Sequence, residues 1–398
     1  MKSQQGVIAA ACLGMLLFGI TLTTLGSVLP PLIERYGLDK AQAGSLMALV
    51  SLGILAASLV FGPVVDRFGY RPVLLAGALG VGVGLGALAL APAVVWLGPA
   101  MLVFGFGGGL LNGATNALVA DVSPEGRGSG LAFLGIFFGI GACGVPLLLS
   151  SMRRSTAYAP TEILGWLALL VLVPLVDFLI VAFPQPKQAQ GFPLRRVGRL
   201  LGDATLLLVG MLLFLQSGME ITLGGWSADY ARDVLSLEEW QSIFLLSLFW
   251  IGMMTARIVL SPLLRFQPAA RLFPFFLLVT LAGAGLLLVV PNAVAAGSGL
   301  FLLGAGLASG FPILLGFLGE IYQDLTGTAF SAVFVMALVG GSALPYLTGV
   351  LGDWQGLRTS LVVIPVAVLG QAFLFALLRR RLGPDAAKTA SSKAEGIL

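Results

Sequence analysis

The chain has 398 residues, of which 58% are hydrophobic and only 10% charged, and its mean hydropathy is +1.01. A water-soluble domain is about one-quarter charged, so this composition excludes a soluble protein. Its formal net charge is +4, and it contains no histidine, which excludes histidine-led metal sites and catalytic triads.

Apolar runs that are long enough to cross a bilayer, which takes about 20 residues, recur along the whole chain. The first run begins close to Met1 and has no A-x-A cleavage pattern, so we expect a retained helix and no signal peptide. Breaks marked by charged residues, proline or glycine predict twelve helices. The first six are expected at 6–32, 41–64, 72–92, 96–120, 128–150 and 162–184, and the second six at 204–230, 240–263, 270–291, 296–319, 327–350 and 356–379.

These runs predict an all-α membrane protein with twelve transmembrane helices in two pseudo-symmetric six-helix bundles. The bundles are expected at 1–184 and 204–382, with a cytoplasmic linker at 185–203 and a disordered cytoplasmic tail at 383–398. Most of the 22 Lys and Arg residues lie on the side that holds both termini and the linker. The positive-inside rule therefore predicts that both termini are cytoplasmic in a multi-pass protein of the cell (plasma) membrane.

Equivalent residues recur at an offset of 199 between the two halves. This offset aligns Pro63 with Pro262, Gly105 with Gly304, Gly107 with Gly306, Asp121 with Glu320, and Pro146 with Pro345. Repeated halves are typical of alternating-access carriers, so the repeat favours a transporter.

Three ionisable residues lie inside the predicted helices, namely Asp177, Glu220 and Arg257. Asp177 and Arg257 lie within about two turns of a predicted cytoplasmic end, so we expect structural roles for both. Glu220 lies roughly 25 Å along its helix and is the candidate for cation coupling, either as a proton carrier or, ionised, as a ligand of sodium. The alternative is a hydrogen-bonded structural glutamate.

Polar and aromatic residues in the apolar field predict a substrate-binding surface. Amide side chains suit sugar hydroxyls because each offers a donor and an acceptor. For the amides of the fourth helix the alternative is hydrogen bonding between helices, and for Trp226 it is an anchor at the membrane interface. The candidate residues are Gln216, Asn112, Asn116, Thr21, Thr24, Trp226 and Trp250, and Gly105 and Gly109 lie on the same stripe as the two asparagines.

Residues 62–72 read GPVVDRFGYRP and lie between the second and third predicted helices. They resemble the GxxxDRxGxR signature of the major facilitator superfamily, which implies the twelve-helix major facilitator fold and a cytoplasmic gate. In such a gate Asp66 can accept from the N-terminus of a helix in the other half, and the arginines can pair with acids. The alternative is a solvated cluster that sets the topology. The candidate gate residues are Gly62, Asp66, Arg67, Gly69, Arg71, Asp121, Arg127 and Glu320.

Residues 216–226 read QSGMEITLGGW and resemble the sugar-porter branch that holds fucose permease and the sodium-dependent glucose transporter-like proteins. Phe311 and Pro312, and the stretch GGSALP at 340–345, are similar to that branch as well. The resemblance implies that the chain transports a sugar.

We therefore expect a secondary active transporter that moves a sugar or a similar small polar solute by alternating access, as a proton- or sodium-coupled symporter. The alternatives are an exporter of hydrophobic compounds and, from another class, a non-transporting membrane sensor. The sequence contains no nucleotide-binding loop and no nucleophile with a base, so we expect no enzyme activity, no cofactor and no metal. The expected partners are the small-molecule substrate and the lipid bilayer, with no nucleic acid, and the protein is expected to be a monomer.

Overall fold

The structure is a computed structural model that describes residues 2–38, 40–155, 160–188, 194–289 and 292–389. Over these residues the chain is helical and contains no strand. Eleven helical stretches are long and apolar enough to span a membrane, and a shorter apolar stretch, Leu164–Ile180, lies between the fifth and sixth of them. Only structures that satisfy every backbone polar group internally can cross lipid, which is why these runs form helices. The prediction of an all-α, twelve-helix membrane protein is confirmed.

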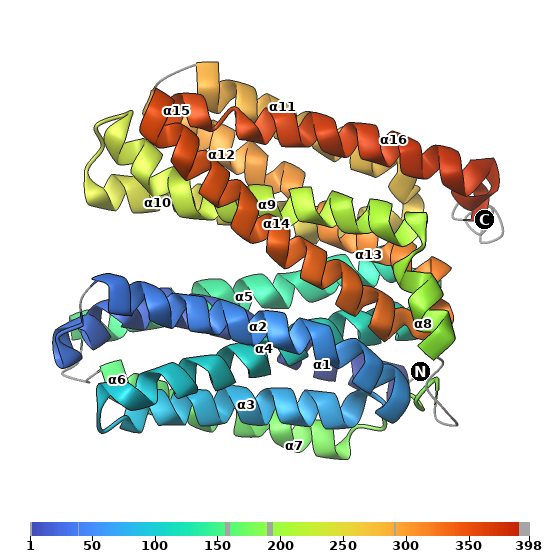
Figure 1. The fold of residues 1–398 in the computed structure, drawn as a ribbon, viewed down its shortest axis with the longest axis horizontal. Coiled ribbons are helices and arrows are strands. Elements are labelled where there is room, and N and C mark those ends of the chain that lie inside the picture. Colours follow the sequence, from blue (N-terminus) through green and yellow to red (C-terminus); the bar gives the residue numbers. More distant parts are fainter. Residues whose placement is uncertain (1, 39, 156–159, 189–193, 290–291, 390–398) are drawn as a thin grey trace. The chain divides into compact units, whose positions relative to one another are not determined.

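The chain divides into two compact units, and unit 1 comprises Met1–Val122, Leu134–Leu194 and Tyr322–Ser331. Within it α4 packs against α1, α2 and α3, and α3 also contacts α6 and α7. Figure 1 shows α3 and α4 lying side by side. Its elements are α1 (Lys2–Tyr36), α2 (Lys40–Phe68), α3 (Tyr70–Leu90), η1 (Val94–Trp96), α4 (Leu97–Val122), most of α5 (Arg127–Ser155), α6 (Pro160–Leu170), α7 (Leu172–Ile180), η2 (Gln323–Leu325) and the first residues of α14 (Thr326–Gln355).

Unit 2 comprises Ser123–Phe133, Arg195–Ile321 and Ala332–Leu398. Here α12 packs against α10 and α11, while α9 contacts α10 and α16, and α11 lies beside α16 (Figure 1). Besides the rest of α5 and α14, its elements are α8 (Leu194–Leu201), which begins at the last residue of unit 1, α9 (Ala204–Asp233), α10 (Glu239–Phe266), α11 (Ala269–Val289), α12 (Ala293–Leu307), α13 (Gly310–Ile321), α15 (Leu357–Ser360) and α16 (Val363–Thr389).

Glycine-mediated helix contacts repeat in the two units at the offset of 199. In unit 1 Gly105 of α4 lies against the carbonyl of Val50 in α2, and in unit 2 Gly304 of α12 lies against the carbonyl of Phe249 in α10. A second pair behaves alike, because Gly53 faces the carbonyl of Leu102 and Gly252 faces that of Phe301. Small residues allow two helix backbones to approach closely in lipid. Each unit thus builds the same helix contact from equivalent positions.

Two of the predicted helices are interrupted in the structure. The sixth, expected over 162–184, is divided into α6 and α7, and the tenth, expected over 296–319, is divided into α12 and α13. A proline follows each break, Pro174 in α7 and Pro312 in α13. Proline cannot donate to the carbonyl four residues earlier, and its ring crowds that carbonyl, which favours an interruption at these positions. Proline alone does not break a helix in this chain, because Pro63, Pro262, Pro274 and Pro345 lie inside continuous helices.

Two other regions differ from the predicted boundaries. The linker expected at 185–203 contains the short helix α8, and α16 continues to Thr389, beyond the point where the tail was expected to begin. The rest of that tail, 390–398, lies outside the described residues. A single residue, Gly69, joins α2 to α3 with φ +85°, a conformation that side chains with a Cβ rarely adopt.

We expect that Gly105→Ala destabilises the protein, because the added Cβ meets the backbone of Val50 in α2. Overpacking of this kind costs about 1–3 kcal/mol. The matched control is Gly86→Ala in α3, where an added Cβ meets nothing within 4 Å. Thermal unfolding in detergent should show a lower Tm for Gly105→Ala and no loss for Gly86→Ala, and equal Tm values for the two variants would contradict this contact.

Candidate functional site

Glu220 and Gln216 lie one turn apart on α9 of unit 2 and are joined by a hydrogen bond. The Nε2 group of Gln216 donates to Oε1 of Glu220 at 2.7 Å. Gln216 is 1% exposed, whereas Glu220 is half-buried. Residues four apart share one face of a helix, and the two side chains meet on that face.

Gln216 also contacts the interruption between α12 and α13. Its Nε2 group donates to the carbonyl oxygen of Leu307, the last residue of α12, at 2.8 Å. Gly310 at the start of α13 leaves room for the amide, since a Cβ at this position would overlap Oε1 of Gln216. A third side chain supports the amide, because Nε2 of Gln371 in α16 donates to Oε1 of Gln216 at 3.3 Å and to the carbonyl of Leu212 at 3.0 Å. The carbonyl of the last residue of α12 therefore belongs to the polar cluster around Glu220.

Arg257 of α10 supplies positive charge to this cluster. Its side chain is 7% exposed and interacts electrostatically with the carboxylate of Glu220. From its position close to a helix end, Arg257 is expected to have a structural role apart from Glu220. The signal for the interaction is that two opposite charges occupy consecutive helices of an otherwise apolar bundle, where an unpaired charge is costly.

The asparagines of α4 lie in unit 1 and bond to each other. Nδ2 of Asn116 donates to the backbone carbonyl of Asn112 at 2.8 Å and to its Oδ1 at 3.1 Å. Asn116 is buried and Asn112 is half-buried. Gly105 and Gly109, which share their stripe, pack against α2. The glycine part of the stripe therefore serves helix packing, and Asn112 is its most accessible polar member.

Thr21 and Thr24 of α1 are fully buried and donate to carbonyls of their own helix. Thr21 Oγ1 bonds to Leu17 O at 2.9 Å, and Thr24 Oγ1 bonds to Ile20 O at 2.6 Å. Thr21 also contacts α4, because a Cβ at Gly108 would meet its side chain. Neither hydroxyl is accessible in this conformation.

The two tryptophans have different surroundings within unit 2. Trp250 of α10 is half-buried and makes an edge-on contact with Phe249, their ring centroids 5.1 Å apart. Trp226 of α9 donates from Nε1 to the carbonyl of Pro345 at 3.1 Å. Its ring lines a cavity of about 420 Å³ between the ends of α9 and α14 and the short helix α15.

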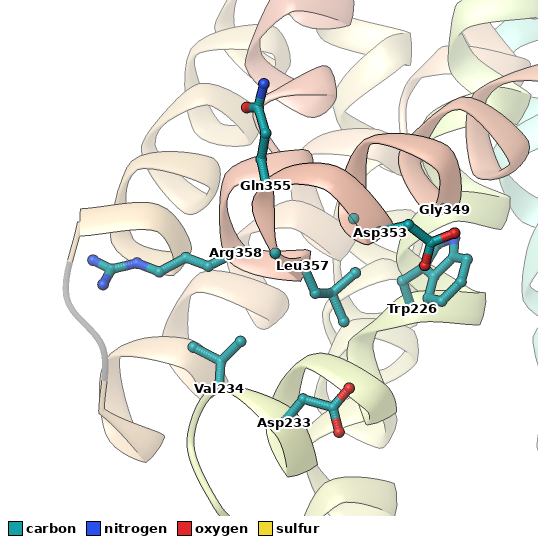
Figure 2. A pocket seen from close by; sticks show the side chains of 10 residues that line it. Trp226, Asp233, Val234, Gly349, Asp353, Gln355, Leu357 and Arg358 are labelled. Carbon is teal, nitrogen blue, oxygen red and sulfur yellow. The ribbon is translucent and has the colours of Figure 1, made fainter.

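Figure 2 shows this cavity with the carboxylates of Asp233 and Asp353 on the same side as the ring of Trp226. The Arg358 side chain is directed away from them (Figure 2) and donates to the carbonyls of Leu288 and Val289 at the end of α11. Trp226, a predicted substrate-binding residue, thus lies beside carboxylates rather than beside Glu220.

Asp66, in the sequence motif at the end of α2, caps the N-terminus of α14 within unit 1. The N–H of Gly327 donates to Oδ1 at 3.2 Å, and the N–H and hydroxyl of Thr328 donate to Oδ2 at 2.8 Å and 2.6 Å. Asp66 is 1% exposed, and Gly62 lies against the backbone of Gly327. This is the contact that the motif predicted, and the role of the contact as a gate stays a prediction. We call the bonds of Asp66 to Gly327 and Thr328 the latch.

The other candidate gate residues lie in different surroundings. In unit 1 Arg67 donates to the carbonyl of Gln188 at 2.9 Å, and Arg71 donates to that of Val181 at 2.8 Å. Asp121 at the end of α4 bonds to Lys187 and Tyr70, neither of which is among the predicted gate residues. In unit 2 Arg127 donates to the carbonyl of Pro124 at 3.4 Å, and Glu320 is exposed at the end of α13.

Comparison with known proteins gives one family match, in which the model of the Major Facilitator Superfamily matches residues 11–345. The transporter y4wD of Sinorhizobium fredii is 27% identical over 92% of this chain and 97% of its own length. The 4-hydroxybenzoate transporter PcaK of Pseudomonas putida is 29% identical over 50% of this chain and 43% of its own length. Among solved structures, the fucose:proton symporter FucP of E. coli matches with a TM-score of 0.80 at 15% identity, over 95% of this chain and 99% of that one.

The electrostatic pair predicts a non-additive effect on stability. Glu220→Gln and Arg257→Gln should each lower the Tm in detergent, because the first leaves the buried Arg257 and the second leaves the half-buried Glu220 without its counter-charge. The double variant should recover part of the loss, with a coupling energy of about 0.5–3 kcal/mol. Additive losses in this double-mutant cycle would show that the two charges act independently.

The packing at the helix break predicts that Gly310→Ala displaces the amide of Gln216. The bonds from Gln216 to Glu220 and to Leu307 should weaken together. We therefore expect a clear loss of transport activity together with only a small fall in Tm. Gly285→Ala in α11, where a Cβ meets nothing within 4 Å, is the matched control. Normal transport by Gly310→Ala would mean that the position of Gln216 does not matter to the cycle.

Proposed function

We propose that this chain, a multi-pass membrane transporter that belongs to the Major Facilitator Superfamily, moves a small polyhydroxylated solute such as a sugar and couples that movement to protons. The observation that carries the proposal is the cluster formed by Glu220, Gln216 and the carbonyl of Leu307 at the end of α12, with Arg257 interacting electrostatically with the carboxylate. An intramembrane carboxylate held at a broken helix is the arrangement by which carriers bind coupling ions.

The charge of Arg257 favours a proton over sodium as the coupling ion. A sodium ion bound at Glu220 would lie close to the guanidinium, and like charges repel strongly where the dielectric constant is low. A proton instead neutralises the carboxylate without adding a cation. Protonation would release Arg257 from Glu220, and loss of the proton would restore the pair, so the pair has two alternative states that a transport cycle can use.

Amide side chains support a polyhydroxylated solute. Gln216 lies in the coupling cluster, and the half-buried Asn112 of α4 offers a donor and an acceptor to a hydroxyl group. The match to the structure of a fucose:proton symporter supports the fold, while the substrate rests on these side chains.

A small aromatic carboxylate is the second candidate substrate. Arg257 is buried, and a guanidinium can hold a carboxylate through two parallel hydrogen bonds. In this case the substrate would take the place of Glu220 beside Arg257 when Glu220 is protonated. A relative of this chain is a 4-hydroxybenzoate transporter, which makes this class worth testing beside the sugars.

The latch supports transport by alternating access. The distribution of basic residues favours a cytoplasmic location for both termini and for the loop that holds Asp66. Asp66 lies at the end of α2, in the first half of the chain, and α14 belongs to the second half. When the cytoplasmic side opens, Gly327 and Thr328 leave Asp66, and the cap is formed again when that side closes.

Uptake into proteoliposomes under imposed gradients tests the coupling. We expect wild-type protein to accumulate a labelled hexose when the outside is more acidic, and one pH unit can drive about tenfold accumulation for one proton per solute. Glu220→Gln should lose this accumulation but keep hexose exchange, because the isosteric amide preserves the polar cluster without binding a proton. Glu162→Gln, an exposed carboxylate at the start of α6, is the matched control and should behave as wild type.

Four outcomes contradict parts of this proposal. Accumulation by Glu220→Gln would remove Glu220 from coupling, and accumulation driven by sodium alone would exclude the proton as the coupling ion. Uptake of 4-hydroxybenzoate in place of every hexose would favour the aromatic carboxylate. Extrusion of a lipophilic dye such as ethidium, without uptake of either solute, would favour an exporter of hydrophobic compounds.

A further inference from the structure

Two residues that follow α7, Lys187 and Gln188, bind the same helix start that Asp66 caps. Both lie in the segment expected to be a simple linker, and all of their partners given below belong to unit 1. We propose that Lys187 and Gln188 are positioning residues of the transport cycle, which hold α14 on the latch and release it when the latch opens. The proposal rests on the latch being part of the transport cycle.

Lys187 connects the end of α4 to the start of α14. Its Nζ donates to Oδ1 of Asp121 at 2.6 Å, to Oγ1 of Thr326 at 2.8 Å and to the carbonyl oxygen of Gln323. An ammonium group has three donors, so these bonds use all of them. The side chain of Lys187 is 27% exposed and that of Asp121 is 10% exposed, so water screens this ion pair only in part.

Asp121 ties this contact to the sequence motif. Its second oxygen accepts a hydrogen bond from the hydroxyl of Tyr70, which is 4% exposed and directly follows Gly69. One carboxylate therefore joins the first residue of α3 to Lys187. Because Asp121 and Tyr70 both lie in the first half of the chain, their bond can persist when the start of α14 moves away.

Gln188 holds the segment on the motif itself. Its N–H donates to the carbonyl of Asp66 at 2.9 Å, and its own carbonyl accepts from Arg67 at 2.9 Å. Its side-chain amide donates to the carbonyl of Asp324 in η2 at 3.1 Å. The backbone of Gln188 thus binds α2, while its side chain binds the turn that precedes α14.

The bonds of the two residues fall into two classes. Those to Asp121, Asp66 and Arg67 stay within the first half of the chain. Those to Gln323, Asp324 and Thr326 reach the second half, and they exist only while α14 is on the latch. The positive end of the α14 helix dipole does not attract an ammonium group, so the dipole does not explain why Lys187 lies there. Asp121 and the carbonyl of Gln323 do explain it.

Hydrogen–deuterium exchange of the full-length protein in lipid nanodiscs tests the proposal without a substrate or a gradient. The amides of Gly327 and Thr328 donate to Asp66, so their exchange reports opening of the latch. We expect Lys187→Gln to speed exchange in peptides that cover 322–331 by about tenfold, the effect of losing charge-assisted hydrogen bonds to this turn. Lys187→Arg, which keeps the charge, should restore slow exchange.

The matched control is Arg199→Gln, which removes an exposed basic residue of α8 in the same linker and should exchange as wild type. Gln188→Ala removes one side-chain bond to η2, so it should give a smaller increase and provides a second variant if Lys187→Gln folds poorly. Unchanged exchange over 322–331 in both Lys187→Gln and Gln188→Ala would overturn the proposal. Faster exchange throughout unit 1 would overturn it as well, because the two residues would then stabilise the whole unit.

This readout separates the proposal from the proposed function. If no hexose is transported but exchange changes as expected, the substrate assignment fails and the role of Lys187 stands. If Lys187→Gln exchanges as expected but shuttles solute at the wild-type rate, opening of the latch is not part of the cycle and the proposal fails. Normal exchange together with gradient-driven hexose uptake leaves the proposed function intact and overturns only the role of Lys187.

Discussion

A backbone N–H or C=O group that lies in lipid without a hydrogen-bond partner costs several kcal/mol, and this constraint determines where polar chemistry can occur in this chain. The helices satisfy nearly all of these groups, and exceptions arise where a helix begins, ends or breaks. At the end of α12 the carbonyl of Leu307 accepts from Gln216, and at the start of α14 the N–H groups of Gly327 and Thr328 donate to Asp66. The candidate coupling cluster and the latch are both built on backbone groups at helix ends, which bond to side chains instead of to their own helix.

The two arrangements use opposite ends of the helix dipole. Asp66 places negative charge at a helix N-terminus, which is the favourable sign. At the break after Leu307 the carbonyl at the end of α12 accepts a hydrogen bond from the amide of Gln216. The same amide donates to the carboxylate of Glu220, which also interacts with the charge of Arg257. A carboxylate placed directly against those carbonyls would be repelled by them, so Gln216 acts as the spacer that lets an acid lie near a helix C-terminus.

Hydropathy and the internal repeat were sufficient to predict the fold, because spanning length, glycine positions and the offset of 199 can be read directly from the order of residues, without knowledge of which helices touch. The repeat reappears as equivalent contacts of Gly105 and Gly304. The isolated position of Glu220 in an apolar helix was also enough to single it out. The interaction of Arg257 with Glu220 could not be predicted, because sequence distance from a helix end does not reveal which neighbouring helix a long side chain reaches. Lys187 and Gln188 were overlooked because a polar segment between bundles has no periodic pattern, and only folding brings it to Asp66 and Asp121.

The hydrogen bonds of Lys187 and Gln188 have a consequence for protein engineering. Polar connections between transporter bundles are the usual places to insert affinity tags, fluorescent proteins or protease sites, since surface loops tolerate added length. Here Lys187 and Gln188 are hydrogen-bonded to Asp66 and Arg67 of α2, to Asp121 of α4 and to Asp324 of η2. Extra residues inserted before Lys187 would shift the register of these two residues relative to all of their partners. A reporter domain fused near the exposed face of α8 leaves that register intact, and it would follow the motion of the molecule without perturbing it.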